Sequence, residues 1–256
     1  MWLGERITDR GIGNGISIII MVGIVARLPH AFLTEFNTRI HSSGGFLMLL
    51  VELIFLFLVF AATIALVQGT RKIPVQYTRR VYGNRQYGGN TSFIPLKINA
   101  ANVMPIIFAQ ALMMFPLLFA QFDATRGIAG TFSNMQGFWY NFVFAALIII
   151  FTYFYTTVVI NPTAMAEEMK KSGGFIPGVQ PGKKTADFID TIMSRITLPG
   201  SIFLALVGIM PALAMICGIT NQFAQFFGGT SLLIVVGVVL DTLQQIETFL
   251  INRHYK

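Results

Sequence analysis

The sequence has 256 residues, of which 54% are hydrophobic and 11% are charged, and its formal net charge at pH 7 is +7. Soluble domains carry about 25% charged residues, so this composition excludes an ordinary soluble protein and is typical of a chain that lies in a lipid bilayer. The single cysteine, Cys217, lies in an apolar segment and cannot form an internal disulfide.

The N-terminal segment, MWLGERITDRGIGNG, is charged and rich in glycine. It lacks the apolar core that follows the basic start of a signal peptide. We therefore expect it to be the tail of a helix that begins further upstream, with Gly11, Gly13 and Gly15 in the turn into the first membrane span. No strand is predicted before these glycines, so we reject a dinucleotide-binding loop.

Six apolar segments follow along the chain. A bilayer core of about 30 Å requires about 20 apolar residues in each helix that crosses it. The first segment is shortened by Arg27 and Pro29 and needs neighbouring helices to stay inserted. We predict an all-α membrane protein with six transmembrane helices, over Gly15–Leu33, Gly44–Val67, Ala101–Phe122, Phe138–Ile160, Leu198–Thr220 and Thr230–Ile251.

The connecting loops divide the cationic residues unevenly. If the loops alternate between the two sides of the membrane, one side carries 15 Lys and Arg and the other carries three, which are Arg27, Arg39 and Arg126. Lys and Arg resist transfer across the bilayer, so we expect both termini and both long loops in the cytoplasm. The chain then divides into two spans at 1–67, a basic loop at 68–99, two spans at 100–160, a second loop at 161–197, and two spans with a tail at 198–256.

The first long loop carries six Lys and Arg and no acidic residue. Two alternating segments, KIPVQY and FIPLKI, flank a glycine-rich middle, a pattern that predicts an irregular hairpin with Arg79, Arg80 and Arg85 at its tip. One alternative is that each cation does no more than fix the topology and contact anionic lipid. The length of the loop favours a docking surface for a cytoplasmic partner.

The second long loop begins with AEEMKK, which suits a short solvated helix ended by two glycines. Pro-Gly pairs at 177–178 and 181–182 predict tight turns at a tip that exposes Lys183 and Lys184. Between Ala186 and Met193, apolar residues recur at helical spacing and can pack on a neighbour.

The third span contains Asn102, Pro105, Gln110 and Pro116. The prolines free backbone carbonyls and kink the helix, which requires buried or wet surroundings. Hydrogen bonds to other helices, worth about 1 kcal/mol each, are one role for the two amides.

Glu52 and Asp241 are ionisable residues inside spans, where such residues suggest a function. A proton relay is one interpretation. We favour a buried structural pair, or for Asp241 a hydrated cytoplasmic cavity.

The sequence shows no pattern of an enzyme. His30, His41 and His254 lie in loops or in the tail, without the spacing of a metal site. A Walker-type phosphate loop is absent from the sequence, so any ATP-driven work belongs to a partner. We therefore expect no catalytic residues, no metal and no cofactor.

Five stretches, in order and at matching spacing, resemble the SecY family, the channel subunit of the bacterial protein-export translocon: ERITDRGIGNGISIII, RKIPVQY, PLKINAANVMP, NPTAMAEEMKKSGGFIPG and FGGTSLLIVV. The resemblance implies a bacterial inner-membrane protein whose six spans correspond to the fifth to tenth helices of the family. These form the second inverted half of the channel plus the last helix of the first half. The first four helices are absent, so the chain alone cannot form the pore.

The resemblance also implies roles for single residues. The family closes its pore with a ring of apolar side chains, which matches Ile20, Ile107 and Ile234 here. A narrow apolar constriction dewets and blocks ions. By residue type alone, an isoleucine in a span more often faces lipid or a neighbouring helix. The third span would form one side of a lateral gate for signal sequences, whose opening Asn102 and Gln110 would tune.

The implied partners are the N-terminal half of SecY, small SecE-like and SecG-like membrane subunits, the SecA motor ATPase, the ribosome, polypeptides with signal sequences, and the lipid bilayer. The docking surface would include Arg71, Lys72, Arg79, Arg80, Arg85, Gln180, Lys183 and Lys184. The family usually has an arginine at the position of Gln180. Glutamine lacks the charged fork of arginine, so the resemblance does not carry a charged contact over to this position.

The leading prediction is a passive polypeptide-conducting channel driven by a docked ribosome or ATPase. The alternative is half of an ion-coupled secondary transporter that uses Glu52 and Asp241. A transporter requires coordinating groups at the membrane midplane, whereas this chain concentrates its polarity in two loops.

Overall fold

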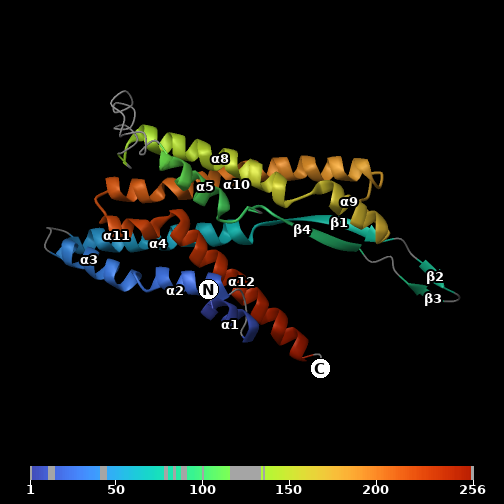
Figure 1. Ribbon diagram of the computed structural model, residues 1–256, viewed down its shortest axis with the longest axis horizontal. Helices are drawn as coiled ribbons and strands as arrows, with labels where there is room; N and C mark the ends of the chain where they lie inside the picture. The colour runs from blue at the N-terminus through green and yellow to red at the C-terminus, as the bar shows by residue number, and fades with distance from the viewer. Residues whose placement is uncertain are drawn as a thin grey trace.

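The computed structural model describes residues 2–10, 15–40, 45–77, 80–82, 85–87, 91–99, 101–115, 134 and 136–254. This part of the chain is mostly helical, and five of its helices are long and apolar enough to cross a membrane. A small sheet lies at one end of the bundle, and α12 crosses the bundle obliquely towards that end (Figure 1). We call this end, with α9 and the start of α10, the sheet end.

The helices are α1 (Trp2–Arg10), α2 (Gly15–Val25), α3 (Leu28–Ile40), α4 (Gly45–Gln68), α5 (Met104–Met113), α8 (Phe138–Val159), α9 (Pro162–Lys171), α10 (Lys183–Ile216), α11 (Asn221–Ala224), the 3-10 helix η2 (Gln225–Phe227) and α12 (Gly229–His254). The expected second, fourth and sixth spans agree closely with α4, α8 and α12. The expected third span is described only as α5 and the residues beside it, and its last residues lie outside the described part of the chain.

The first span is longer than predicted. α2 ends at Val25, a turn covers Ala26 and Arg27, and α3 continues to Ile40, so that the segment is 26 residues long. Pro29 is the second residue of α3, where a helix loses no hydrogen bond to proline. The expectation that Pro29 shortens the span is therefore wrong, whereas the helix is interrupted at Arg27, as a turn there separates α2 from α3.

The fifth span is also part of a longer helix. α10 runs for 34 residues through Pro199 and Pro211, and it joins the helical segment predicted after the loop tip to the span itself. It ends before the predicted Thr220 because Gly218 adopts a φ of +86°. The Gly218 N–H donates to the Met215 carbonyl and the Ile219 N–H to the Ala214 carbonyl, which is the Schellman pattern of a helix end.

The two long loops form one unit rather than two. In the first loop, β1 (Thr70–Tyr77) pairs antiparallel with β4 (Thr91–Lys97), as the alternating pattern predicted. In the second, β5 (Gly174–Phe175) adds to the free edge of β1 and gives the order β4-β1-β5. The expected all-α class is therefore too narrow, because the loops build a sheet outside the apolar spans.

The tip of the first loop is a second, smaller hairpin. β2 (Arg80–Tyr82) pairs antiparallel with β3 (Arg85–Tyr87). In Figure 1 this hairpin projects beyond the larger sheet, away from the helices. The predicted irregular hairpin with a protruding tip is confirmed for the backbone.

The three largest buried clusters among the described residues hold most of these elements together. α10 packs on α8 and α5 through Leu204, Val207, Ile148 and Ile106. At the sheet end, inward-facing residues of β1 and β4 pack on α9 and α10, and the cluster includes Ile73, Val75, Leu96, Met169, Ile189 and Met193. At the opposite end, phenylalanines of α11 and η2 pack on α3.

Candidate functional site

The three isoleucines predicted to form a ring border one cavity. Ile20 lies on α2, Ile107 on α5 and Ile234 on α12, and all three line a cavity of about 500 Å³. Ile20 and Ile107 are 48% and 43% exposed, whereas Ile234 is half-buried. The fold thus brings together three apolar side chains that are up to 214 positions apart in the sequence (234 − 20).

The same cavity has polar walls. Lys97 at the end of β4, Asn99 in the following turn and Asp241 on α12 line it together with the isoleucines. Asn99 Nδ2 donates to the Asn102 carbonyl oxygen over 3.4 Å, and Asn99 Oδ1 is buried without a hydrogen-bond partner in the described part of the chain. The cavity therefore combines an apolar edge with groups that bind water.

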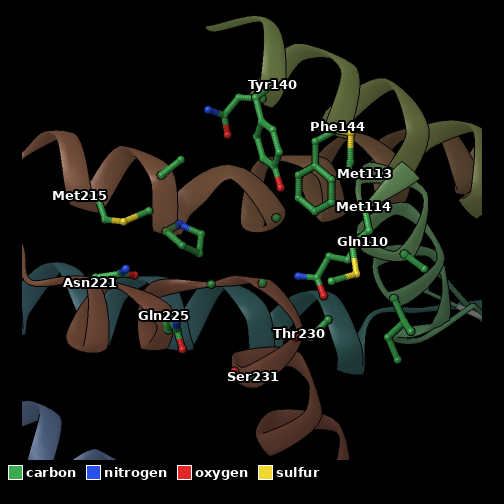
Figure 2. Close-up of a pocket in the computed structure, with 18 residues that line it drawn as sticks. Gln110, Met113, Met114, Tyr140, Phe144, Met215, Asn221, Gln225, Thr230 and Ser231 are labelled. Carbon is green, nitrogen blue, oxygen red and sulfur yellow. The ribbon is translucent and has the colours of Figure 1, made fainter. Parts of the chain in front are cut away.

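The two amides of the third span lie on different cavities. Asn102 lines the cavity of the isoleucines, in the turn before α5, with a φ of +52°. Gln110 lines a second cavity of about 600 Å³ between α5, α8 and α10, with Tyr140, Met113 and Met215 (Figure 2). Ile107 borders both cavities, so α5 separates them.

Most of the cationic residues predicted for docking lie at the sheet end. Arg71 and Lys72 are exposed on β1, and Lys183 and Lys184 are exposed in the first turn of α10. Arg80 and Arg85 lie in the projecting β2–β3 hairpin, whereas Arg79 lies outside the described residues. Two loops that are about 100 residues apart thus present their cations at one end of the molecule (Figure 1).

Gln180 lies at the tip between the two Pro-Gly pairs. Its side chain is exposed, and its backbone carbonyl accepts a hydrogen bond of 2.9 Å from the Thr185 hydroxyl. Gly178 and Gly182 adopt φ values of +84° and +109°, which confirms the tight turns predicted here. The turn therefore presents the Gln180 side chain to solvent.

Glu52 and Asp241 have different surroundings. Glu52 is 4% exposed and forms an ion pair with Arg39, so the favoured interpretation of a buried structural pair is confirmed. Asp241 is exposed and also lines an open hollow beside Gln244, Gln245 and Thr248 on α12. This position agrees with the predicted hydrated cavity.

Sequence reasoning missed the partners of Glu52. Arg39 also pairs with Glu35, which was not identified as a candidate although it is 1% exposed. The signal was present, because Glu35 and Arg39 have the i, i+4 spacing of a helical ion pair and a carboxylate inside a span requires a cation. Among the described residues, no group of three or more His, Cys, Asp or Glu is arranged to hold a metal ion.

These features define a class of protein: a multi-pass membrane protein whose helices border a cavity with an apolar edge and whose basic loops project from one end. The family model of SecY matches residues 1–243 of the sequence. The chain belongs to the SecY family.

Curated relatives resemble this sequence over its whole length. Protein translocase subunit SecY of Mycobacterium tuberculosis (strain ATCC 25618 / H37Rv) is 42% identical over 268 residues and that of Halalkalibacterium halodurans is 45% identical over 265 residues. Both alignments cover 100% of this chain, but they cover 60% and 61% of the relatives. The chain therefore spans about three fifths of the length of these relatives.

Solved structures share the fold. One, described as "The structure of a protein conducting channel", has a TM-score of 0.60 and 18% sequence identity, with 96% of this chain and 61% of that chain covered. Another concerns how "the plug domain of the SecY protein" maintains "a membrane seal". It has a TM-score of 0.63 and 18% sequence identity, with 96% of this chain and 62% of that chain covered. The arrangement of helices is therefore that of the SecY channel.

Proposed function

We propose that this chain is part of a passive protein-conducting channel that moves polypeptides across or into the bacterial inner membrane. The observation that carries the proposal is the meeting of Ile20, Ile107 and Ile234 at one cavity in a chain of the SecY family. The printed names of the relatives, protein translocase subunits, support the same function. The chain itself performs no catalysis.

The six spans supply the second inverted half of the channel and the last helix of the first half. Support comes from the alignment, which covers the whole chain but only about 60% of each relative. In this assignment α5 is the described part of the third span, and a further part of the channel supplies the remaining four helices.

The three isoleucines form the constriction of the closed channel. They are hydrophobic, they come from three separate helices, and polar groups lie beside them in the same cavity. A narrow apolar ring expels water and so blocks ions, while its flexible side chains can yield to a passing polypeptide. Asn102 and Gln110 adjust the movement of α5 as one side of the lateral gate.

The basic sheet end docks the partners that supply energy. A ribosome or a SecA-type motor ATPase binds Arg71, Lys72, Arg79, Arg80, Arg85, Gln180, Lys183 and Lys184, and small SecE-like and SecG-like subunits bind within the membrane. The excess of Lys and Arg in the loops supports a cytoplasmic location for this end and for both termini. The ion pair between Glu52 and Arg39 counts against the transporter alternative, because a transporter needs this carboxylate free to bind the coupling ion.

The test replaces Ile107 and Ile234 with glycine in the assembled channel, reconstituted in lipid vesicles. We expect the resting ion conductance to rise at least about tenfold, because a shortened apolar ring no longer dewets. Replacement of Phe57, which is 76% exposed on α4, with alanine is the control and should leave the conductance unchanged. An unaltered conductance in the double glycine variant would contradict the assignment of the ring.

A further inference from the structure

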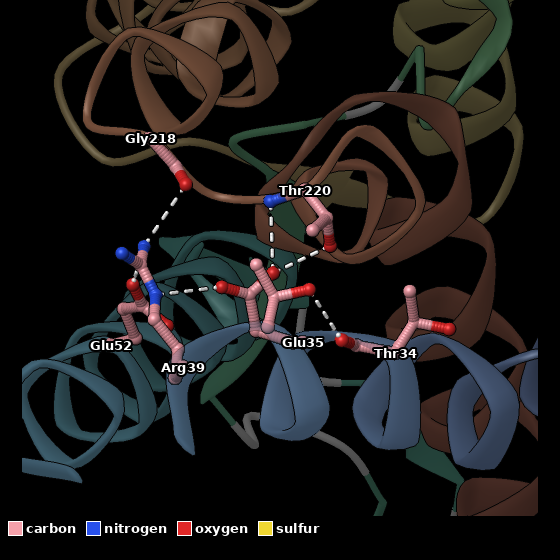
Figure 3. Close-up of polar contacts among 7 residues, drawn as sticks. Thr34, Glu35, Arg39, Glu52, Gly218 and Thr220 are labelled. Carbon is pink, nitrogen blue, oxygen red and sulfur yellow. Dashed lines mark hydrogen bonds and ion pairs between the residues drawn. The ribbon is translucent and has the colours of Figure 1, made fainter. Parts of the chain in front are cut away.

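Arg39 lies at the centre of a polar cluster that contains two buried carboxylates (Figure 3). It is in the last turn of α3, which ends on the side of the bundle opposite the sheet (Figure 1). Its Nε donates to Glu35 Oε1 over 2.9 Å, and its Nη2 contacts Glu52 Oε1. The same Nη2 donates to the Gly218 carbonyl oxygen over 3.0 Å. One guanidinium thus contacts α3, α4 and the turn that follows α10.

Glu35 extends the cluster to the same turn. Its Oε2 accepts from the Thr220 backbone N–H over 2.8 Å and from the Thr220 hydroxyl over 2.5 Å. The two carboxylates are 1% and 4% exposed, so both depend on the protein for partners. We define the clasp as Glu35, Arg39, Glu52, Gly218 and Thr220.

The turn held by the clasp leads directly to the proposed constriction. It continues into α11 and η2, whose Phe223 and Phe227 are buried. Phe227 stacks on Phe55 of α4 with ring centroids 5.9 Å apart, and Phe223 meets Phe32 of α3 edge-on at 6.3 Å. α12 then begins at Gly229 and presents Ile234 little more than one helical turn later.

We propose that Arg39 is a positioning residue for the constriction: through Glu35, Glu52 and the 217–220 turn it fixes the start of α12, and with it Ile234, relative to Ile20 on α2. This inference rests on the proposed function. α2 and α3 are joined by the short turn at Ala26–Arg27, so the clasp on α3 also restrains the helix that carries Ile20. Both isoleucines therefore belong to one restrained unit.

Arg39 is the cation that neutralises both carboxylates of the clasp. Two buried carboxylates share one guanidinium, so replacement of Arg39 with glutamine leaves both without a cationic partner. Replacement of Glu52 with glutamine leaves the Glu35–Arg39 pair and its contacts with Gly218 and Thr220 in place. Lysine at position 39 keeps the charge but lacks the fork that reaches Glu35, Glu52 and Gly218 together.

The experiment measures resting ion conductance of the assembled channel in lipid vesicles for Arg39→Gln, Arg39→Lys and Glu52→Gln. We expect at least about a tenfold rise for Arg39→Gln, a smaller rise for Arg39→Lys and the smallest for Glu52→Gln, because leaving buried carboxylates unpaired is the largest disturbance. The matched control is Thr38→Val, since Thr38 is the exposed neighbour of Arg39 and its hydroxyl donates to the Thr34 carbonyl of the same helix, its one hydrogen bond among the described residues.

Assembly is followed by co-purification of the other subunits and by thermal unfolding in detergent. Assembled Arg39→Gln channels with wild-type conductance would overturn the proposal. If Arg39→Gln does not assemble, Arg39→Lys decides in its place, and a wild-type conductance of that variant would equally overturn it. Ile234→Gly serves as the reference variant. If Ile234→Gly raises the resting conductance while the Arg39 variants do not, only this inference fails. If Ile234→Gly leaves the resting conductance at the wild-type value, the proposed constriction itself is wrong.

Discussion

α10 and α12 are both long apolar helices, but they have different surroundings. In the most apolar stretch of α10, 44% of the residues are buried, against 6% in the corresponding stretch of α12. α10 packs on α8, α5, α9 and the sheet, and so forms the framework of the molecule. α12 turns most of its surface outward, with Ile234 and Asp241 at a cavity.

The difference separates residues that hold the fold from residues that are available for other contacts. Equal hydrophobicity does not distinguish the two kinds, because lipid, a pore and a packed neighbour all accept apolar side chains. Burial does distinguish them. Substitutions on the framework should change stability, whereas substitutions on α12 and on the basic hairpins should change conduction or docking.

The largest expected effect on the stability of the membrane helices is at Gly208 of α10. A Cβ at this position would lie 2.6 Å from Ile148 Cδ1 and 3.4 Å from Phe144 Cε1, so the two helices pack closely only around glycine. Gly208→Leu should destabilise the α8–α10 contact by about 3 kcal/mol, because overpacking forces the helices apart. Thermal unfolding in detergent measures the change.

The matched control for this substitution is Gly237→Leu on α12. A Cβ at Gly237 meets no atom within 4 Å among the described residues. Its stability should stay within about 0.5 kcal/mol of the wild type. Equal destabilisation by the two substitutions would remove the distinction between framework and outward-facing helix.

The next effect concerns the junction of the sheet with α10. Val75 is fully buried between β1 and the helices, so Val75→Asp places an unpaired carboxylate in an apolar cluster. We expect this to destabilise the folded sheet by about 3 kcal/mol or more. The 68–99 segment should then open locally, while the membrane helices stay folded. Rapid protease cleavage within that segment, with unchanged helical circular dichroism, checks this. Phe93→Asp on β4, where the side chain is 56% exposed, should leave the cleavage rate near that of the wild type.

The smallest effect on stability is expected at the projecting hairpin. Reversal of charge at Arg79, Arg80 and Arg85 should leave membrane insertion and unfolding unchanged, but should weaken binding of the proposed cytoplasmic partners about tenfold through loss of charge complementarity. Vesicle co-sedimentation with the motor ATPase and with ribosomes, at two salt concentrations, measures this affinity. Unchanged affinity for both partners would refute docking through these arginines.

Local patterns predicted much of this fold. The bounds of α4, α8 and α12 agree closely with the apolar segments, and the alternation around Ile73 and Val75 predicted the β1–β4 hairpin. The extents of α3 and α10 were missed, because proline in the first turn of a helix is harmless and because a helix can leave the membrane without a break.

Contacts between distant segments were not predictable in the same way. Nothing local in Gly174 and Phe175 indicates a third strand on β1, since the pairing depends on how α9 and α10 place them. The resemblance, rather than the residue pattern, identified the three isoleucines, which are ordinary residues for a membrane helix. The Glu35–Arg39–Glu52 cluster required the structure to show which carboxylates share the arginine.

The most direct test of the account is to ask which residues a moving polypeptide touches. A photo-crosslinking amino acid would be placed at position 20, 107 or 234, or at the outward-facing position 57 of α4, in assembled channels that hold a polypeptide stalled during export. If the three isoleucines form the constriction, the stalled polypeptide will crosslink to all three positions and not to position 57. Crosslinks from position 57 but from none of the three isoleucine positions would contradict it.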